Sequence, residues 1–356
     1  MTTILDCIQR IPEICEKILD SYPAFLAPVT EGLGEELGRI DELVFVGSGT
    51  SDTSARTSQP IVGKVSGLRT TVLWPSELER ISSYGMNPRG LYIFTSQTGT
   101  SKLTAAMMAK VQEAGCHAMS ITESEGTPLA KASRIHVVMG CGQEEFLMRT
   151  IGYVSSALVH CLLGLQIGLR RGYLSQEEHD AYLAKARGAA QNRRLVTEQI
   201  KTRFPEIRDQ LKRAQEVIFT GNGSLYGVSL EGAVKFWEMP QKPCIGLELE
   251  EGLHGPNFGY GEHQCVIYLA DGMEPDKAKG LSLVRYMKDV FGMGIAIGDV
   301  PEELGIALPV KGGEFSFIEM SAVVQVLAYE LTRAIGRDVS RPIDHSVMNS
   351  YFTTHG

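Results

Sequence analysis

Three charged residues stand in one stretch of the chain at the spacing of a helix face. Glu231, Lys235 and Glu238 follow each other at intervals of four and three residues, so a helix would place them on one side. Glu231 and Lys235 alone would be an ordinary exposed ion pair. Glu238 stands between Trp237 and Met239, and apolar surroundings raise the pKa of a carboxylate. Because a raised pKa suits proton transfer, Glu238 is a candidate acid or base.

A histidine follows in a turn rich in glycine and proline. His254 stands in the sequence Glu-Glu-Gly-Leu-His-Gly-Pro, residues 250–256. A histidine side chain can give and take a proton near neutral pH, so His254 is a second candidate acid or base. For a single histidine, a satisfied structural role would be the commoner case. Neither His254 nor His263 has an H-E-x-x-H or cysteine-rich partner, so we expect no metal and no cofactor.

Two turns between an expected strand and an expected helix could bind an anion. Residues 95–101 read TSQTGTS and hold five hydroxyl groups, whereas a helix cap needs only one. Hydroxyls and backbone N–H groups at a helix start can bind phosphate. No Gly-Lys pair follows, so ATP chemistry is not indicated. The other turn, residues 47–51 (GSGTS), could bind an anion or be a plain turn.

Alternating strands and helices must position these groups. In the first half we expect strands at 43–48, 70–74, 91–96, 118–122 and 135–139, with helices at 51–65 and 101–114. In the second half we expect strands at 216–220, 265–270 and 294–297, with helices at 225–238, 276–290 and 317–335. Apolar strands separated by helices predict parallel sheets covered on both faces. The predicted domains are a helical segment (1–40), an α/β domain (41–172), a helix or helix pair as linker (173–213) and a second α/β domain with a tail (214–356).

Composition narrows the class of protein. The net charge is -8 without a basic stripe, which argues against nucleic acid as a partner. The seven cysteines form no C-x-x-C pair, which is typical of reduced thiols in a cytoplasmic protein. No secretory signal opens the chain. Residues 151–169 are long enough to span a membrane, but we expect a buried core helix and no membrane partner.

In this order, the motifs resemble the tandem sugar isomerase (SIS) domain family. The chain has S-x-x-G-x-S after a strand, then L-E-G-A-x-K in a helix, then E-x-x-H-G-P. The pattern is similar to the isomerase half of glucosamine-6-phosphate synthase, and the fructoselysine-6-phosphate deglycases are also single tandem-SIS chains. The separation of 16 residues between Glu238 and His254 (254 minus 238) matches the catalytic glutamate and histidine of that family. The resemblance covers about residues 30–345 and implies two flavodoxin-like SIS domains, each with a five-stranded parallel sheet between helices.

The resemblance also implies roles for individual residues. Glu238 would move a proton between C1 and C2 of a phosphorylated sugar. His254 would help to open the sugar ring and would reach the site of a neighbouring subunit, so a homodimer or larger assembly is implied. The substrate-binding residues would be those of the two turns together with the neighbours of Glu238, namely Thr50, Ser51, Ser96, Gln97, Thr98, Ser101, Glu231 and Lys235.

Two departures from the synthase pattern point to a particular chemistry. No glutaminase cysteine follows the initiator methionine, and the tail lacks the lysine that forms an imine with the ketose, since the last lysine is Lys311. A substrate that already carries an amine would not need this lysine, although His345 could replace it. We therefore expect an isomerase, deglycase or deaminase acting on an amino sugar phosphate or a hexose 6-phosphate–amine adduct. A non-catalytic phosphosugar sensor and a synthase unit supplied with ammonia or glutamine remain alternatives.

Overall fold

The computed structural model describes residues 2–339 and 346–355, and within them the chain forms two compact units. Among the described residues, the first-sheet unit comprises Lys17–Glu144, Ile151–Ala181 and residues 346–355, and the second-sheet unit comprises residues 2–16, Glu145–Thr150 and residues 182–339. The domain limits at 41–172 and 214–356 stay a prediction. His345 lies outside the described residues.

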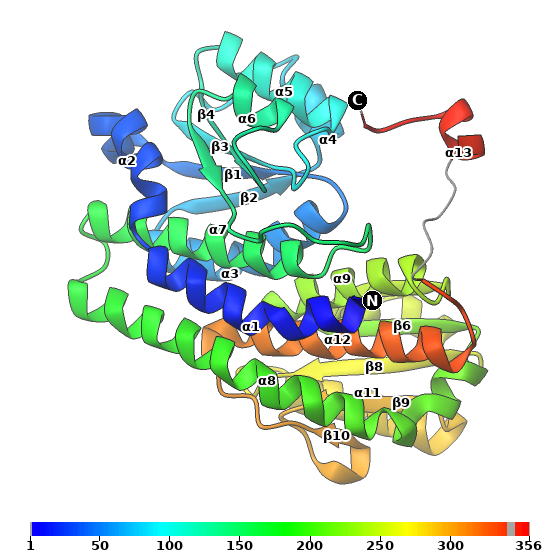
Figure 1. Cartoon of the computed structure of the whole chain (residues 1–356). Coiled ribbons are helices and arrows are strands. Elements are labelled where there is room, and N and C mark those ends of the chain that lie inside the picture. Colours follow the sequence, from blue (N-terminus) through cyan, green and yellow to red (C-terminus); the bar gives the residue numbers. More distant parts are fainter. Residues whose placement is uncertain (1, 340–345, 356) are drawn as a thin grey trace. The chain divides into compact units, whose positions relative to one another are not determined.

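The first-sheet unit is built on five parallel strands in the order β2-β1-β3-β4-β5. The strands are β1 (Glu42–Val46), β2 (Arg69–Leu73), β3 (Gly90–Thr95), β4 (His117–Thr122) and β5 (His136–Val138). Helices α3 (Thr50–Ser66) and α7 (Ile151–Arg170) cover one face, and α4 (Pro75–Ile81), α5 (Lys102–Glu113) and α6 (Pro128–Ala132) cover the other (Figure 1). Alternate side chains of β1 and β3 meet the apolar face of α5, in a core of Val44, Val46, Tyr92, Phe94, Met107, Met108 and Val111. This alternation follows from the period of two along a strand.

The second-sheet unit repeats this topology. Its five parallel strands lie in the order β10-β9-β8-β6-β7. Read from the other edge, as β7-β6-β8-β9-β10, this order corresponds strand by strand to β2-β1-β3-β4-β5 of the first sheet. They are β6 (Glu216–Gly221), β7 (Cys244–Glu248), β8 (Gln264–Ala270), β9 (Gly294–Gly298) and β10 (Gly305–Ala307). Helices α9 (Ser224–Glu238) and α12 (Ser316–Ala334) pack together, and α11 (Lys277–Phe291) lies along β8 and β9. The individual strands at 244–248 and 305–307 are not predicted from the sequence.

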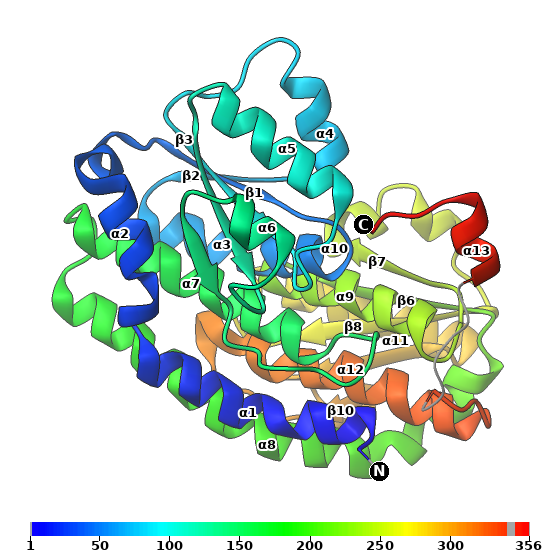
Figure 2. The same cartoon turned by 45° about the horizontal axis from the view of Figure 1, so that its top comes forward.

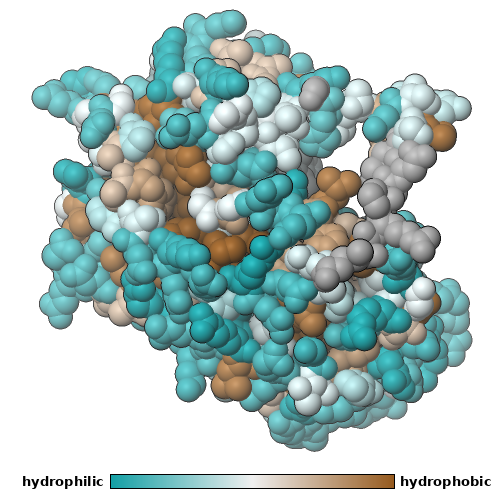
Figure 3. Space-filling model, viewed as in Figure 1, coloured by the Kyte–Doolittle hydropathy of each residue, from teal (hydrophilic) through white to brown (hydrophobic). Residues whose placement is uncertain are grey.

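The remaining elements are helical. They are α1 (Ile4–Ser21), η1 (Ala24–Leu26), α2 (Ala27–Leu33), η2 (Gly34–Arg39), α8 (Gln176–Arg213), α10 (Leu249–Gly252), η3 (Pro256–Gly259), η4 (Glu302–Leu304), η5 (Gly313–Phe315) and α13 (Ser346–Tyr351). The predicted helix or helix pair is one helix of 38 residues, which continues through Pro205. Its exposed face is hydrophilic (Figure 3), as its charged sequence requires.

Two stretches within the described residues are long and apolar enough to cross a membrane by composition alone. They are Ile151–Arg170 and Gly313–Ala334. The most apolar window of the first is entirely buried inside the chain, and 89% of the corresponding window of the second is buried. The prediction that residues 151–169 form a buried core helix is therefore confirmed, and both helices have the burial of core helices in soluble proteins.

Candidate functional site

The topology of the first sheet directs two loops to the same edge. The connections from β1 and from β3 run to opposite sides of the sheet, because β2 lies beyond β1 and β4 lies beyond β3. In an open α/β sheet, ligands bind outside the carboxyl ends of the strands at such a switch point. The two predicted anion-binding turns, residues 47–51 and 95–101, follow β1 and β3 directly.

The turn after β1 brings the start of α3 close to the sheet. A Cβ atom at Gly47 would lie 2.8 Å from the Cβ atom of Ser51, so only glycine allows this approach. Gly49 has a φ of 57°, which favours glycine, and α3 begins at Thr50. Thr50 and Ser51 therefore lie in the first turn of α3, at the switch point of the sheet. This position is compatible with the sugar-pocket role predicted for them, which stays a prediction.

The loop after β3 is held by its own backbone. The N–H of Ser96 donates to the carbonyl oxygen of Ile121 (3.1 Å), and the N–H of Gly99 donates to that of Ser96 (3.0 Å). Gly99 has a φ of 61°, and a Cβ atom there would lie 2.6 Å from the side chain of Thr127. The loop thus places Thr98 and Ser101 at the start of α5 without using a charged side chain.

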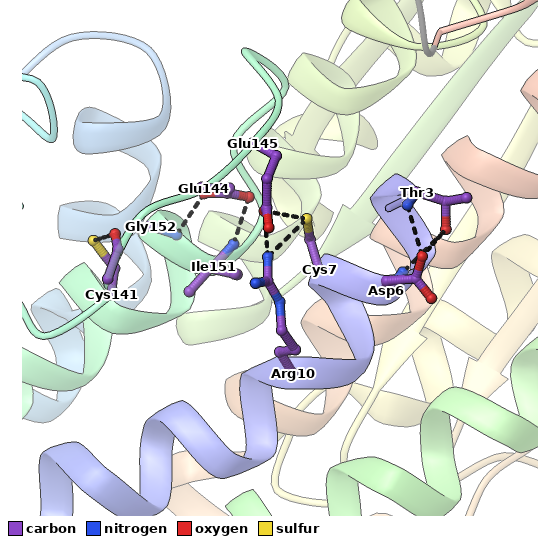
Figure 4. A network of polar contacts seen from close by, with 10 residues as sticks. Thr3, Asp6, Cys7, Arg10, Cys141, Glu144, Glu145, Ile151 and Gly152 are labelled. Atoms are coloured by element: carbon purple, nitrogen blue, oxygen red, sulfur yellow. Dashed lines mark hydrogen bonds and ion pairs between the residues drawn. The ribbon is translucent and has the colours of Figure 1, made fainter. Parts of the chain in front are cut away.

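One side chain of this loop has a hydrogen-bonding atom without a partner. The Nε2 atom of Gln97 is buried and makes no hydrogen bond, although a buried amide without a partner costs about 1–3 kcal/mol. Its Oε1 atom lies where a Cβ atom at Gly152 would be, at 1.8 Å. Gly152 and Ile151 donate their N–H groups to Glu144 and so fix the start of α7 (Figure 4). A buried donor without a partner is suited to a ligand oxygen.

In the second-sheet unit, the three charged residues of α9 form one cluster. The ammonium group of Lys235 lies 3.3 Å from Glu231 Oε1 and 2.5 Å from Glu238 Oε2. The side chains of Glu231 and Lys235 are fully buried, whereas that of Glu238 is 34% exposed. The helical spacing is therefore confirmed, but the alternative of an ordinary exposed pair for Glu231 and Lys235 is wrong.

The surroundings of Glu238 also differ from the expectation of an apolar pocket. Lys235 faces its carboxylate, and Trp237 is largely exposed and donates from Nε1 to the carbonyl oxygen of Cys244 (2.8 Å). In a helix, the residues next to Glu238 in sequence point away from its side chain, so the apolar Trp237 and Met239 do not form its surroundings. Glu238 thus meets a positive charge on one side and solvent on the other.

His254 does not contact this cluster within the described part of the second-sheet unit. Its Nδ1 atom lies 2.8 Å from the carbonyl oxygen of Glu250, and its side chain is 68% exposed. Because a carbonyl oxygen only accepts, Nδ1 carries the proton of this hydrogen bond. The Nε2 atom therefore remains available for proton transfer at the surface.

The loop of the second sheet that corresponds to residues 95–101 is acidic. It follows β8 and contains Asp271 and Glu274, and the carboxylate of Glu274 accepts hydrogen bonds from the N–H groups of Asp271 and Gly272. Burial, with the nearby charge of Asp271 as the next cause, raises the pKa of Glu274 to about 7. Negative charge in this loop disfavours a phosphate, in contrast to the uncharged residues 95–101 after β3.

The raised pKa of Glu274 predicts a pH-dependent stability. Between its ordinary pKa of 4.5 and about 7, the folded chain binds more protons at this residue than the unfolded chain. The contribution of Glu274 to the free energy of unfolding therefore falls as the pH rises through this window. We expect denaturation midpoints from pH 4.5 to 7 to fall more steeply for the unchanged protein than for the Glu274→Gln variant. Parallel curves for the two proteins would contradict the assignment.

The structure adds features that sequence reasoning missed. His160, fully buried, lies between the hydroxyls of Thr95 (2.9 Å) and Ser58 (3.2 Å), and burial lowers its pKa to about 3. The neutral imidazole of His160 therefore holds the end of β3 through Thr95. In the sequence, only the apolar residues around it at 151–169 could have indicated that His160 is buried. Within residues 2–339 and 346–355, no group of three or more His, Cys, Asp or Glu side chains is arranged to hold a metal.

Comparisons with known proteins agree with this arrangement. The glutamine–fructose-6-phosphate aminotransferase (isomerizing) of Caulobacter vibrioides is 23% identical to this chain over 341 residues, which are 93% of the chain and 56% of the relative. The same enzyme of Tropheryma whipplei is 25% identical over 327 residues, which are 89% of the chain and 53% of the relative. The chain thus spans little more than half the length of these curated relatives. No protein-family model matches the chain.

Solved structures show the same fold. The C-terminal domain of glucosamine-fructose-6-phosphate aminotransferase from Francisella tularensis has a TM-score of 0.84 at 19% identity, with 95% of this chain and 98% of that chain covered. Glucosamine-6-phosphate deaminase from Thermotoga maritima has a TM-score of 0.74 at 20% identity, covering 96% and 98%. The resemblance found in the sequence is confirmed: the chain is homologous to the isomerase (SIS) part of the aminotransferases and has the fold of phosphosugar isomerases.

Proposed function

We propose that this chain is a tandem-SIS enzyme that acts on an amino sugar phosphate or on a hexose 6-phosphate–amine adduct. The observation that carries the proposal is Glu238, whose half-buried carboxylate lies 2.5 Å from the fully buried ammonium group of Lys235. Desolvating Lys235 and Glu231 costs several kcal/mol per ion, which stability alone does not explain. A base held in position by such a pair is suited to proton transfer.

The phosphate of the substrate binds the loop after β3 in this proposal. Thr98 and Ser101 donate hydroxyl protons, the buried Nε2 atom of Gln97 donates to a phosphate oxygen, and the start of α5 adds its partial positive charge. Ser96 belongs to the same loop, and Thr50 and Ser51 contact the sugar. One phosphosugar binds per chain, because the corresponding loop of the second sheet carries Asp271 and Glu274.

Glu238 then moves one proton between neighbouring carbons. Its carboxylate takes the proton from one of C1 and C2 while the carbonyl oxygen gains a proton from solvent, and the substrate becomes an enaminol whose nitrogen is the substrate's own amine. The same carboxyl group returns the proton to the other carbon while the nitrogen releases a proton to solvent, which converts the enaminol into an imine. Water hydrolyses this imine to a carbonyl group and a free amine. His254 opens the sugar ring by proton transfer at Nε2, which its hydrogen bond to Glu250 leaves available.

The proposal extends to assembly and compartment. His254 is exposed and separate from the Glu238 cluster in its own unit, which favours a homodimer or larger assembly in which this side chain serves a neighbouring subunit. The seven cysteines are all buried and form no disulfide with one another, as in proteins of the reducing cytoplasm. Neither the exposed His254 nor the buried cysteines favour a membrane or a nucleic acid as a partner.

Mass-spectrometric turnover by the purified protein tests the function. The panel is fructoselysine 6-phosphate, glucoselysine 6-phosphate, glucosamine 6-phosphate, and fructose 6-phosphate with ammonia. We expect release of a free amine and a hexose phosphate from at least one amine-bearing substrate, because the substrate brings its own nitrogen. No turnover, together with tight binding of fructose 6-phosphate, would favour a sensor instead. Turnover of fructose 6-phosphate with ammonia alone would favour a synthase unit.

A further inference from the structure

The end of the chain lies against the loop after β3, within the first-sheet unit. Both views draw the end of the chain beside α5 (Figures 1 and 2). Ser101 and His355 form an antiparallel bridge, and the N–H of Lys102 donates to the carbonyl oxygen of Thr354 (3.2 Å). The side chain of His355 takes part as well, since its Nδ1 atom lies 3.2 Å from the hydroxyl oxygen of Thr100.

These contacts continue into the loop as a chain of hydrogen bonds. The hydroxyl oxygens of Thr100 and Thr98 are 2.9 Å apart, so Nδ1 of His355, Thr100 and Thr98 form one series. Each hydroxyl has a single proton, so the donor at one end fixes the direction of every bond in the series. Thr98 is the member that the proposed function places against the phosphate.

The proton on Nδ1 decides what Thr98 can offer to an anion. If Nδ1 carries a proton, it donates to Thr100, Thr100 donates to Thr98, and the proton of Thr98 is free for a phosphate oxygen. If Nδ1 is bare, it accepts from Thr100, so Thr98 must donate to Thr100. Thr98 would then present only lone pairs to the phosphate, which is unfavourable.

We propose that His355 is a positioning residue for the phosphate site and that it orients the hydroxyl of Thr98 through Thr100. The inference rests on the proposed function, because it requires a phosphate at Thr98. It assigns a role to the end of the chain that the motifs of the loop do not contain. The charged group closest in sequence to these contacts is the exposed Lys102 at the start of α5, and the proposal does not require its side chain.

Calorimetric titration of the full chain with fructose 6-phosphate tests the inference. We expect His355→Ala to weaken binding about 10-fold, the usual scale for a hydrogen bond to a charged group. His355→Asn should restore the affinity to within about 3-fold, because the asparagine amide nitrogen replaces Nδ1 as a donor. His355→Gln, whose amide nitrogen corresponds to Nε2, should remain weak. In a Thr98→Val background, His355→Ala should have no further effect.

The outcomes separate this inference from the proposed function. Equal affinities of the unchanged protein and His355→Ala would overturn the inference alone. Asparagine and alanine variants that are equally weak would also overturn it, because a donor at the position of Nδ1 would then have no effect on binding. If the unchanged protein bound neither fructose 6-phosphate nor inorganic phosphate, the proposed function would fail and the inference with it.

Discussion

Glu238→Gln is expected to lower turnover of the amine-bearing phosphosugar roughly 10²- to 10⁴-fold, the usual contribution of a positioned acid or base. The amide has nearly the same shape as the carboxylate but cannot take a proton from carbon. Lys235 keeps its second partner, Glu231, at 3.3 Å, so the helix should fold as before. Because the phosphate loop lies on other residues, the dissociation constant of fructose 6-phosphate should change by less than about 3-fold. Single-turnover kinetics and calorimetry on the same preparation measure both effects.

A matched substitution shows whether the effect belongs to this carboxylate. Glu177 is an exposed glutamate near the start of α8, and Glu177→Gln makes the same chemical change without touching the charged cluster of α9. Its turnover should equal that of the unchanged protein. A Glu238→Gln variant that retains full turnover would exclude Glu238 as the base. Loss of both turnover and binding would instead indicate a structural role for the carboxylate.

The sequence is informative about the fold where the hydrophobic pattern is strong. The strands at 43–48 and 91–96 are confirmed to within a residue or two, because β1 and β3 are fully buried and read as continuous apolar runs. The edge strands β7 and β10 were not predicted individually. Most of β7 is at least partly exposed, and β10 has three residues, so pairing with a neighbouring strand stabilises them more than their own sequence does.

The site was predictable only where neighbours in sequence are neighbours in space. The cluster of Glu231, Lys235 and Glu238 follows from helical spacing alone, but its burial depends on what packs against α9. The side chain of Gln97 occupies space that Gly152 leaves open, and Gly152 is 55 positions further along (152 minus 97). The contact of His355 with Thr100 joins positions that are 255 residues apart. No local pattern encodes such pairs, so these features required the structure.

The buried pair of α9 gives the prediction with the largest effect on stability. Lys235→Met removes the ammonium group and leaves the carboxylate of Glu231 fully buried beside an apolar side chain. Removing one partner of a buried ion pair costs about 3–5 kcal/mol, so chemical denaturation should show a loss of this size in the free energy of unfolding. Glu79→Gln, which changes an exposed ion pair between α4 and Lys110 of α5, provides the control and should cost less than about 1 kcal/mol.

The double variant Glu231→Leu with Lys235→Met separates folding from function. Both charges are replaced by apolar side chains of similar volume, so stability should return to within about 1 kcal/mol of the unchanged protein or rise above it. Turnover should nevertheless stay low, because Glu238 has lost the ammonium group that lies 2.5 Å from its carboxylate. A stable double variant with full turnover would show that the pair serves only the fold. A stable and inactive double variant would mean that Lys235 is kept, despite the desolvation of its charge, because it holds the base in position.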